Sequence, residues 1–119
     1  MFVEKKANTL EEGIKNLMAG AKADYVRMST SGGKELSGYS KEQVDSWDNK
    51  TKVSQGKKYI KIVQDTGVFC FVAKEDFKQF KKGDVLKAAG YNKPALNAPR
   101  GNVLEGNYPI RWTGPLYLK

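Results

Sequence analysis

The stretch from residue 57 to residue 74 constrains the fold most, because it holds the densest run of β-branched and aromatic residues in the chain around a single turn signal. Residues 59–63 and 68–72 carry the strand formers. Between them, Asp65-Thr66-Gly67 is typical of a tight turn in which Gly67 is free to take positive φ. The sequence therefore predicts a β-hairpin on which the rest of the chain is organised.

The two faces of this hairpin are both apolar, with one exception. If the loop has two residues, side chains alternate between the faces, and one face is expected to belong to the core. Its members are Ile60, Ile62, Phe69, Phe71 and Ala73. The other face is too apolar to lie in water although it includes a lysine, so we expect a helix or another subunit to cover part of it. Its members are Tyr59, Lys61, Val63, Val68, Cys70 and Val72.

An amphipathic helix is predicted for residues 9–23. Thr9 and Glu12 have the spacing of a capping box, in which the two side chains bond to the first backbone N–H groups of a helix. Apolar residues then recur at the helical period, which predicts a narrow buried stripe packed on a sheet. These residues are Leu10, Ile14, Leu17, Met18 and Ala21.

Shorter elements are predicted between this helix and the hairpin. Residues 24–31 alternate with period two, which predicts a half-buried strand that ends at Gly32-Gly33. Residues 40–49 predict a short helix or turn anchored by Trp47. Residues 51–54 predict a polar strand, so the strand and the hairpin together form a β-meander.

After the hairpin the pattern becomes irregular. Residues 74–82 predict a helical turn with Phe77 and Phe80 on one side, and residues 85–89 predict another strand. Residues 90–109 contain three prolines, three glycines and four asparagines, which predicts a long loop with its only regular element at residues 102–104. Residues 110–118, with a turn at Gly114-Pro115, predict a final edge strand.

Length and composition predict a single domain over residues 1–119, with the helix at 9–23 and a β-rich part at 24–119. No window approaches the ~18 apolar residues of a membrane-spanning helix, and residues 1–13 have no apolar leader segment, so we expect no membrane partner. The one cysteine, Cys70, has no partner for a disulfide. A reducing cytoplasm is therefore the expected location.

The net charge of +8 is unevenly distributed along the chain. Residues 1–49 contain 7 Lys and Arg against 8 Asp and Glu, a balance of −1, whereas residues 50–119 contain 14 against 5, a balance of +9. A field of that sign attracts phosphate groups in nucleic acids, nucleotides or anionic membranes without selecting among them. The alternative reading is a charge that serves solubility alone.

The residue types argue against an enzyme. The chain has no histidine, which is the usual general base and the commonest metal ligand, and Cys70 lies between two phenylalanines with no partner to activate it. The carboxylate neighbours Glu11-Glu12 and Glu75-Asp76 are expected on solvated surface helices. Ser31-Gly32-Gly33-Lys34 lacks the spacing of a P-loop. We expect a non-enzymatic protein with no cofactor and no metal.

Cations, aromatic rings and asparagines recur together in the C-terminal third. Rings stack on bases, amides read base edges and guanidinium groups hold phosphates, so these types favour single-stranded nucleic acid. The alternative is that Arg100-Gly101-Asn102 is a turn, that Trp112 belongs to the core and that the asparagines cap loops. The predicted binding residues, including lysines around the hairpin, are Lys57, Lys58, Lys61, Lys81, Lys82, Tyr91, Asn92, Lys93, Arg100, Asn102, Tyr108, Arg111 and Trp112.

A family resemblance covers the last two-thirds of the chain. The order KKYIKIVQD, a turn, VFCFVAK, FKKGDVLKAA, NKPALNAPRGNVL and WTGPLYLK resembles small proteins of marine phages. The plan of a helix followed by five strands is similar to that of Sm-like barrels. This resemblance implies a strongly bent antiparallel sheet, homo-oligomers joined edge to edge into rings, and loops that bind single-stranded RNA.

The sequence therefore predicts an α+β fold, with an N-terminal helix on a strongly bent, mostly antiparallel five-stranded sheet or a small Sm-like or SH3-like barrel. The predicted function is binding of single-stranded RNA or DNA as a homo-oligomer, in the host cytoplasm if the chain comes from a phage. Two alternatives stay open. One is a phage protein that sequesters a small phosphorylated nucleotide, and the other is a structural or interaction protein.

Overall fold

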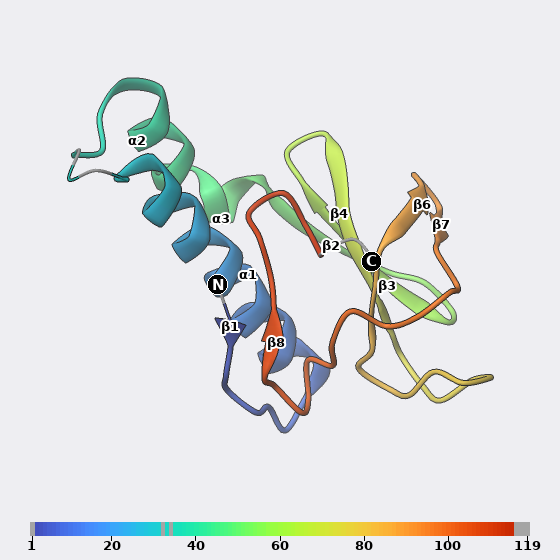
Figure 1. The fold of residues 1–119 in the computed structure, drawn as a ribbon. Helices are drawn as coiled ribbons and strands as arrows, with labels where there is room; N and C mark the ends of the chain where they lie inside the picture. The colour runs from blue at the N-terminus through green and yellow to red at the C-terminus, as the bar shows by residue number, and fades with distance from the viewer. Residues whose placement is uncertain (1, 32, 34, 116–119) are drawn as a thin grey trace.

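The computed structural model describes residues 2–31, 33 and 35–115 and has an α+β fold (Figure 1). Within these residues, three helices precede most of the strands: α1 (Leu10–Ser29), α2 (Gly38–Asp45) and α3 (Trp47–Lys50). The strands are β1 (Phe2–Val3), β2 (Thr51–Gln55), β3 (Tyr59–Gln64), β4 (Gly67–Ala73), β5 (Val85–Leu86), β6 (Ala88–Gly90), β7 (Lys93–Pro94) and β8 (Tyr108–Pro109). The predicted α+β class is confirmed. No helix in the described ranges has the length and apolar character needed to cross a bilayer.

All strand pairing among the described residues is antiparallel. The main sheet has the order β2-β3-β4-β5, which confirms the predicted meander, and β1-β8 and β6-β7 form two small sheets. The main sheet thus has four strands rather than five, and the strands do not close into a barrel. The reason is that the chain leaves the main sheet after β5, since β6 pairs with β7 and β8 returns to the N-terminus.

Helix α1 begins as predicted and ends later than predicted. Thr9 is the N-cap, and its side chain accepts a hydrogen bond of 3.1 Å from the backbone N–H of Glu12. The helix continues to Ser29, so the predicted strand at residues 24–31 is wrong. The buried stripe runs on from Ala21 through Asp24, a charged residue whose burial the helical pattern does not reveal.

Two glycines allow other segments to approach α1 closely. A Cβ atom at Gly13 would lie 2.6 Å from the carbonyl oxygen of Val103, and one at Gly20 would lie 2.7 Å from a methyl group of Val3. The loop after β7 and the strand β1 therefore pack directly on the helix backbone. These contacts explain why glycine, a poor helix former, occurs twice inside a 20-residue helix.

The central hairpin is confirmed, but its turn is built differently. Gln64 pairs with Gly67, so the turn consists of Asp65 and Thr66. Asp65 has the positive φ, +60°, that we predicted for Gly67. A β-bulge follows, because Val63 pairs with Val68 whereas Ile62 pairs with Cys70, which leaves Phe69 as an extra residue.

The bulge reverses the predicted faces of β4 from Cys70 onward. Cys70 and Val72 join Ile60 and Ile62 in the main core under α1, and Phe71 moves to the opposite face with Tyr59. The prediction that placed Phe71 and Ala73 with Ile60 is therefore wrong, whereas Phe69 stays in the main core. The predicted burial of Cys70 is confirmed, and burial raises the pKa of its thiol.

The outer face of the main sheet, the face away from α1, is covered in part by the chain itself. Phe71 forms a second apolar cluster there with Phe80 and Leu86, flanked by Tyr59 and Phe77. The segment that contains Phe77 and Phe80 is a tight turn rather than the predicted helical turn. Phe77 and Phe80 exchange backbone hydrogen bonds of 3.0 and 2.8 Å, and Lys78 in the turn has a positive φ of 50°.

The C-terminal region departs from the sequence prediction at three places. The strand predicted for residues 85–89 is divided between β5 and β6. Asn102 makes an isolated bridge with Asp84 instead of beginning a regular element. Arg111 and Gly114 close a tight turn, and residues 116–118 of the predicted edge strand lie outside the described residues.

Candidate nucleic-acid interface

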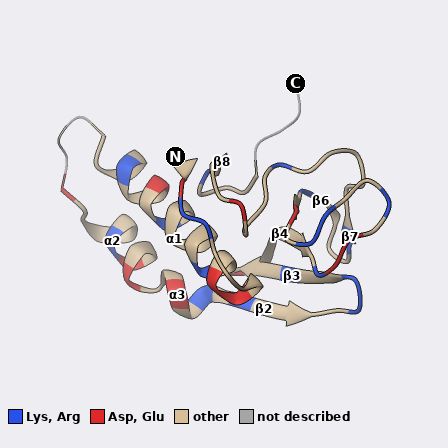
Figure 2. Ribbon diagram, turned by 90° about the horizontal axis from the view of Figure 1, so that it is seen from below, with Lys and Arg blue, Asp and Glu red and all other residues tan. Residues whose placement is uncertain are grey.

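Basic residues gather in the sheet half of the molecule. Figure 2 shows Lys and Arg along the β2–β3 turn, on β3 and in the loops around β6 and β7, whereas the helices show both signs of charge. The predicted residues in this half include Lys57 and Lys58 before β3, Lys81 and Lys82 before β5, and Lys93 in β7. All five are exposed to solvent.

Register places two further groups on the outer face beside Lys61. Ser54 pairs with Lys61, and Lys52 pairs with Val63. Val53, between them, lines a groove with residues of α1 and therefore points to the inner face. Since side chains alternate along a strand, Lys52 and Ser54 point outward with Lys61. Lys52 is not among the residues predicted from the sequence, although the polar strand predicted at residues 51–54 places Lys52 and Ser54 on one face.

Three of the predicted residues meet in one place, which we call the Lys61 cluster: Lys61, Tyr91 and Asn92. The ammonium nitrogen of Lys61 lies 4.0 Å from the centroid of the Tyr91 ring and donates a hydrogen bond of 2.9 Å to the side-chain oxygen of Asn92. Tyr91 and Asn92 form the turn between β6 and β7. The contacts hold this turn over the sheet while the Tyr91 side chain stays 58% exposed.

Two of the predicted residues in the long loop are bound within the fold. Arg100 donates hydrogen bonds of 2.8 Å to the side chain of Asn97 and 2.7 Å to the carbonyl of Ala98. Asn102 is buried, and its amide nitrogen donates to the Lys82 carbonyl at 2.9 Å and to a carboxylate oxygen of Asp84 at 3.0 Å. The Asn102 bonds fasten the loop to the turn before β5, whereas the Arg100 bonds stay within the loop.

Tyr108 is also an interior residue. Its ring belongs to the main core, and a Cβ atom at Gly101 would lie 2.3 Å from the Cβ atom of Tyr108. Burial, with Cys70 nearby, raises the pKa of the Tyr108 phenol. A base has no access to this ring in the described structure, so we leave Asn102 and Tyr108 out of the proposed surface.

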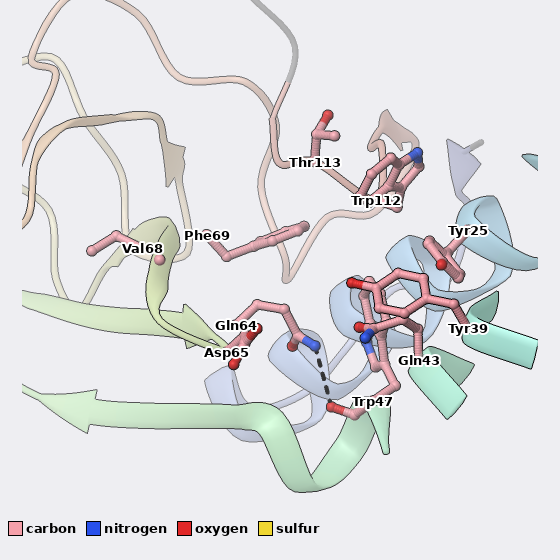
Figure 3. Close-up of a pocket in the computed structure, with 11 residues that line it drawn as sticks. Tyr25, Tyr39, Gln43, Trp47, Gln64, Asp65, Val68, Phe69, Trp112 and Thr113 are labelled. Carbon is pink, nitrogen blue, oxygen red and sulfur yellow. Dashed lines mark hydrogen bonds between the residues drawn. The ribbon is translucent and has the colours of Figure 1, made fainter. Parts of the chain in front are cut away.

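Trp112 lines a different feature, an aromatic pocket with a volume of about 290 Å³ (Figure 3). The pocket lies among α1, α2, α3, the β3–β4 turn and the loop that follows Ile110. Its lining comprises Tyr25, Tyr39, Gln43, Trp47, Gln64, Asp65, Gly67, Val68, Phe69, Trp112 and Thr113. Arg111, the predicted neighbour, is exposed and does not line the pocket.

The rings of the pocket stand at angles to one another. Tyr25 meets Trp112 edge to face, with centroids 5.1 Å apart and planes at 79°, and it meets Trp47 at 5.8 Å with planes at 39°. Trp47 is only 3% exposed, whereas Trp112 is 39% exposed. The side chain of Gln64 donates a hydrogen bond of 3.4 Å to the Trp47 carbonyl, which ties the β3–β4 hairpin to α3 (Figure 3).

Asp24 of α1 holds the backbone of Trp112 in place. One of its carboxylate oxygens accepts a 3.0 Å hydrogen bond from the backbone N–H of Trp112, and the other accepts one of 3.0 Å from the Arg27 guanidinium. Burial alone would raise the pKa of Asp24, but these hydrogen bonds outweigh it and hold that pKa below its ordinary value of 3.8. A buried carboxylate thus connects α1 to a residue 88 positions later in the chain.

Comparisons with protein-family models, curated proteins and solved structures gave no match to this chain. In the part of the chain that the structure describes, no group of three His, Cys, Asp or Glu side chains is placed to hold a metal ion. Function is therefore inferred from the two surface features, the Lys61 cluster and the aromatic pocket.

Proposed function

We propose that this protein binds single-stranded nucleic acid on the outer face of its main sheet, without catalysing a reaction. The supporting observation is the Lys61 cluster, in which a cation, an exposed ring and an amide are in contact on one surface. The ring is held in place before any ligand arrives, so less conformational entropy is lost when a base stacks on it.

In this proposal the lysines and the cluster have different tasks. Lys52, Lys57, Lys58 and Lys93 neutralise phosphates of the bound strand, an interaction that does not depend on sequence. Tyr91 stacks on one base. Because Asn92 accepts from Lys61 through its oxygen, its amide nitrogen is left to donate to a base edge.

A titration with single-stranded RNA, single-stranded DNA and duplex at several salt concentrations tests this function. Affinity for single strands should fall with salt by a slope of about 0.7 per phosphate neutralised. Tyr91→Ala should weaken single-strand binding by about 1–3 kcal/mol and leave the salt slope unchanged, because the ring contributes stacking and no charge.

Tyr39→Ala is the matched control, since Tyr39 is an exposed tyrosine of the aromatic pocket. It should bind single strands as the wild type does. If no nucleic acid binds even at low salt, the proposal is rejected. The structural or interaction role then gains support, whereas a small phosphorylated ligand is less suited to the pocket because none of its described lining residues is Lys or Arg.

We further propose that two copies associate along β2. The apolar hairpin face that suggested an oligomer is covered within the chain, because Phe71, Phe80 and Leu86 form an apolar cluster on it. In the described residues, however, β2 pairs only with β3, and its other edge is open. Beside this edge a groove runs between α1 and β2, with Ile14 in its lining and Val53 left 47% exposed.

An antiparallel pairing centred on Val53 fits the sequence of β2. It places Val53 against Val53 of the second copy and Lys52 against Ser54, so no two lysines stand directly opposite each other. The outer faces of both copies would then form one surface for a nucleic-acid strand. Light scattering should give about twice the chain mass of 13.3 kDa.

Val53→Lys should return the mass to that of one chain, because it places two like charges together at the pairing centre. Met28→Lys, at an exposed apolar residue of α1, is the control and should leave the dimer intact. A wild-type protein that is monomeric at high micromolar concentration would exclude this assembly. The nucleic-acid proposal does not depend on it.

A further inference from the structure

We propose that the aromatic pocket binds a compact organic cation, an ammonium group that carries several methyl groups. This inference goes beyond nucleic-acid binding, because it concerns a separate site and a ligand of the opposite charge. It rests on the arrangement of the rings, on the charges in the lining and on the size of the pocket.

The rings surround a rounded group better than a flat one. A stacked base needs ring faces that are nearly parallel to it, but the planes of Tyr25 and Trp112 stand at 79° and those of Tyr25 and Trp47 at 39°. A methylated ammonium has no plane to align and is attracted to each ring through cation–π interaction. Figure 3 shows Tyr39 of α2 on the helix side of the pocket, beside Tyr25 and Trp47, and Phe69 of β4 on the opposite, hairpin side.

The charges in the lining favour a cation. Among the lining residues that the structure describes, Asp65 is the one charged residue and none is Lys or Arg, although the chain as a whole carries +8. The position of Asp65 is fixed by the tight turn and by its backbone N–H, which donates a 2.9 Å hydrogen bond to the Lys50 carbonyl. Asp65 therefore places a negative charge at the hairpin end of the pocket, where it attracts a cation electrostatically.

The pocket is small and one of its walls is adjustable. Its volume of about 290 Å³ lies at the lower end of the range for ligand sites, which suits a head group rather than a whole nucleotide. Tyr39 is 72% exposed and belongs to α2, a helix that buries none of its residues. A small movement of α2 would bring the Tyr39 ring onto the ligand at little cost to the core.

A methylated ammonium occurs both in free small molecules such as choline and on methylated lysine side chains of peptides. The lining recognises the chemistry that the two share. Titrations with choline, with tetramethylammonium and with a peptide containing one trimethyl-lysine distinguish the sources. Tighter binding of the peptide than of both free cations would indicate a protein ligand.

The chain's own fluorescence provides the readout. Trp47 and Trp112 are the two tryptophans of the sequence, and both line the pocket. We expect a saturable change in tryptophan emission with the cations at constant ionic strength. The uncharged isostere of choline, 3,3-dimethylbutan-1-ol, should bind at least about tenfold more weakly, because it has the shape of choline but no charge for the rings and the carboxylate to attract.

Two variants separate the contributions. Asp65→Asn keeps the turn, since asparagine tolerates positive φ, and should weaken cation binding about two- to fivefold. Tyr39→Ala should weaken it by a similar factor at least, the effect of one cation–π contact. Glu75→Gln and Tyr91→Ala, which remove an exposed carboxylate and an exposed ring outside the pocket, are the matched controls and should bind as the wild type does.

Three results would overturn the inference. Equal binding of choline and its uncharged isostere would show an apolar pocket without charge selection. A stronger response to mononucleosides than to the cations would assign the pocket to a base. The absence of a saturable change with any methylated ammonium would show that the rings serve packing alone.

Discussion

The aromatic pocket and the Lys61 cluster both present aromatic rings at the surface, yet their neighbours differ in charge and in depth. In the pocket, rings from several elements line a space in which Asp65 is the one charged residue of the described lining. In the cluster, a single ring on a two-residue turn lies against a lysine. The neighbours of a ring, rather than the ring, determine whether it favours a cation or a nucleic-acid base.

The two features also differ in what they contribute to folding. Trp47 belongs to the main core, whereas Tyr91 contacts the fold through Lys61 and remains mostly exposed. The pocket is therefore part of the folded framework, and the cluster is an addition to its surface. This difference can be measured in four ways, which follow in order of decreasing effect.

Truncation of one ring from each feature should give the largest contrast. Trp47→Ala should lower the free energy of unfolding by about 3–5 kcal/mol, because it leaves a cavity in the core. Tyr91→Ala should change it by no more than about 0.5 kcal/mol, as is usual for an exposed residue. Urea unfolding of both variants measures the two values. Similar costs would contradict the distinction between framework and addition.

Removal of Asp24 should have the next largest effect. Asp24→Ala leaves the backbone N–H of Trp112 without its acceptor at a part-buried position, which should cost about 1–3 kcal/mol of unfolding free energy. Asp45→Ala, at an exposed carboxylate of α2, is the control and should cost less. A cost for Asp24→Ala no greater than that of the control would mean that the Trp112 loop does not need this anchor.

The stabilisation by Asp24 should depend on pH. Because its pKa in the folded protein is lowered, the stabilisation is fully present above the ordinary value of 3.8 and is lost as the pH falls from there through the lowered value. The difference in unfolding free energy between wild type and Asp24→Asn should therefore shrink over the pH interval below about 4. A difference that stays constant over this interval would rule out a lowered pKa.

Charge removal from the proposed nucleic-acid surface should give the smallest change. In the double variant Lys52→Gln, Lys57→Gln, the salt slope of single-strand binding should fall by about 1.4, the value for two phosphate contacts. The cation response of the pocket should stay the same. The pair Lys15→Gln, Lys41→Gln, on α1 and α2, should leave the slope unchanged. An equal loss in both double variants would indicate a nonspecific effect of net charge.

Local patterns were sufficient to predict much of the fold. The capping box at Thr9 and the turn signal at Asp65-Thr66-Gly67 use interactions between residues close in sequence, so α1 begins and the hairpin turns where predicted. The end of α1 was missed because the stripe continues through Asp24, whose burial depends on Arg27 and on the distant Trp112. A buried charge that is stabilised by a residue far away in the chain leaves no pattern in the sequence around it.

The candidate sites show the same limit. Lys61, Tyr91 and Asn92 were singled out by type, but their contact depends on the path of β6 and β7 over the sheet. Tyr25, Tyr39 and Trp47 were not predicted to meet Trp112, because they come from separate helices and Tyr25 was assigned to a strand. Asn102 and Tyr108 have the residue types of a binding loop and are nevertheless interior, which only burial distinguishes.

The extra residue in β4 has a consequence for how the chain finds its strand register. On either side of Phe69, both alternating sets of β4 side chains are apolar, so a slip by one position would exchange Cys70 for Phe71 without exposing a polar group. The burial of apolar side chains therefore does not favour the correct pairing over the slipped one. Side-chain volume does distinguish the two pairings, because the slip would place a phenyl ring in the core under α1, where a thiol fits. Correct pairing of this hairpin depends on the shapes of its two cores.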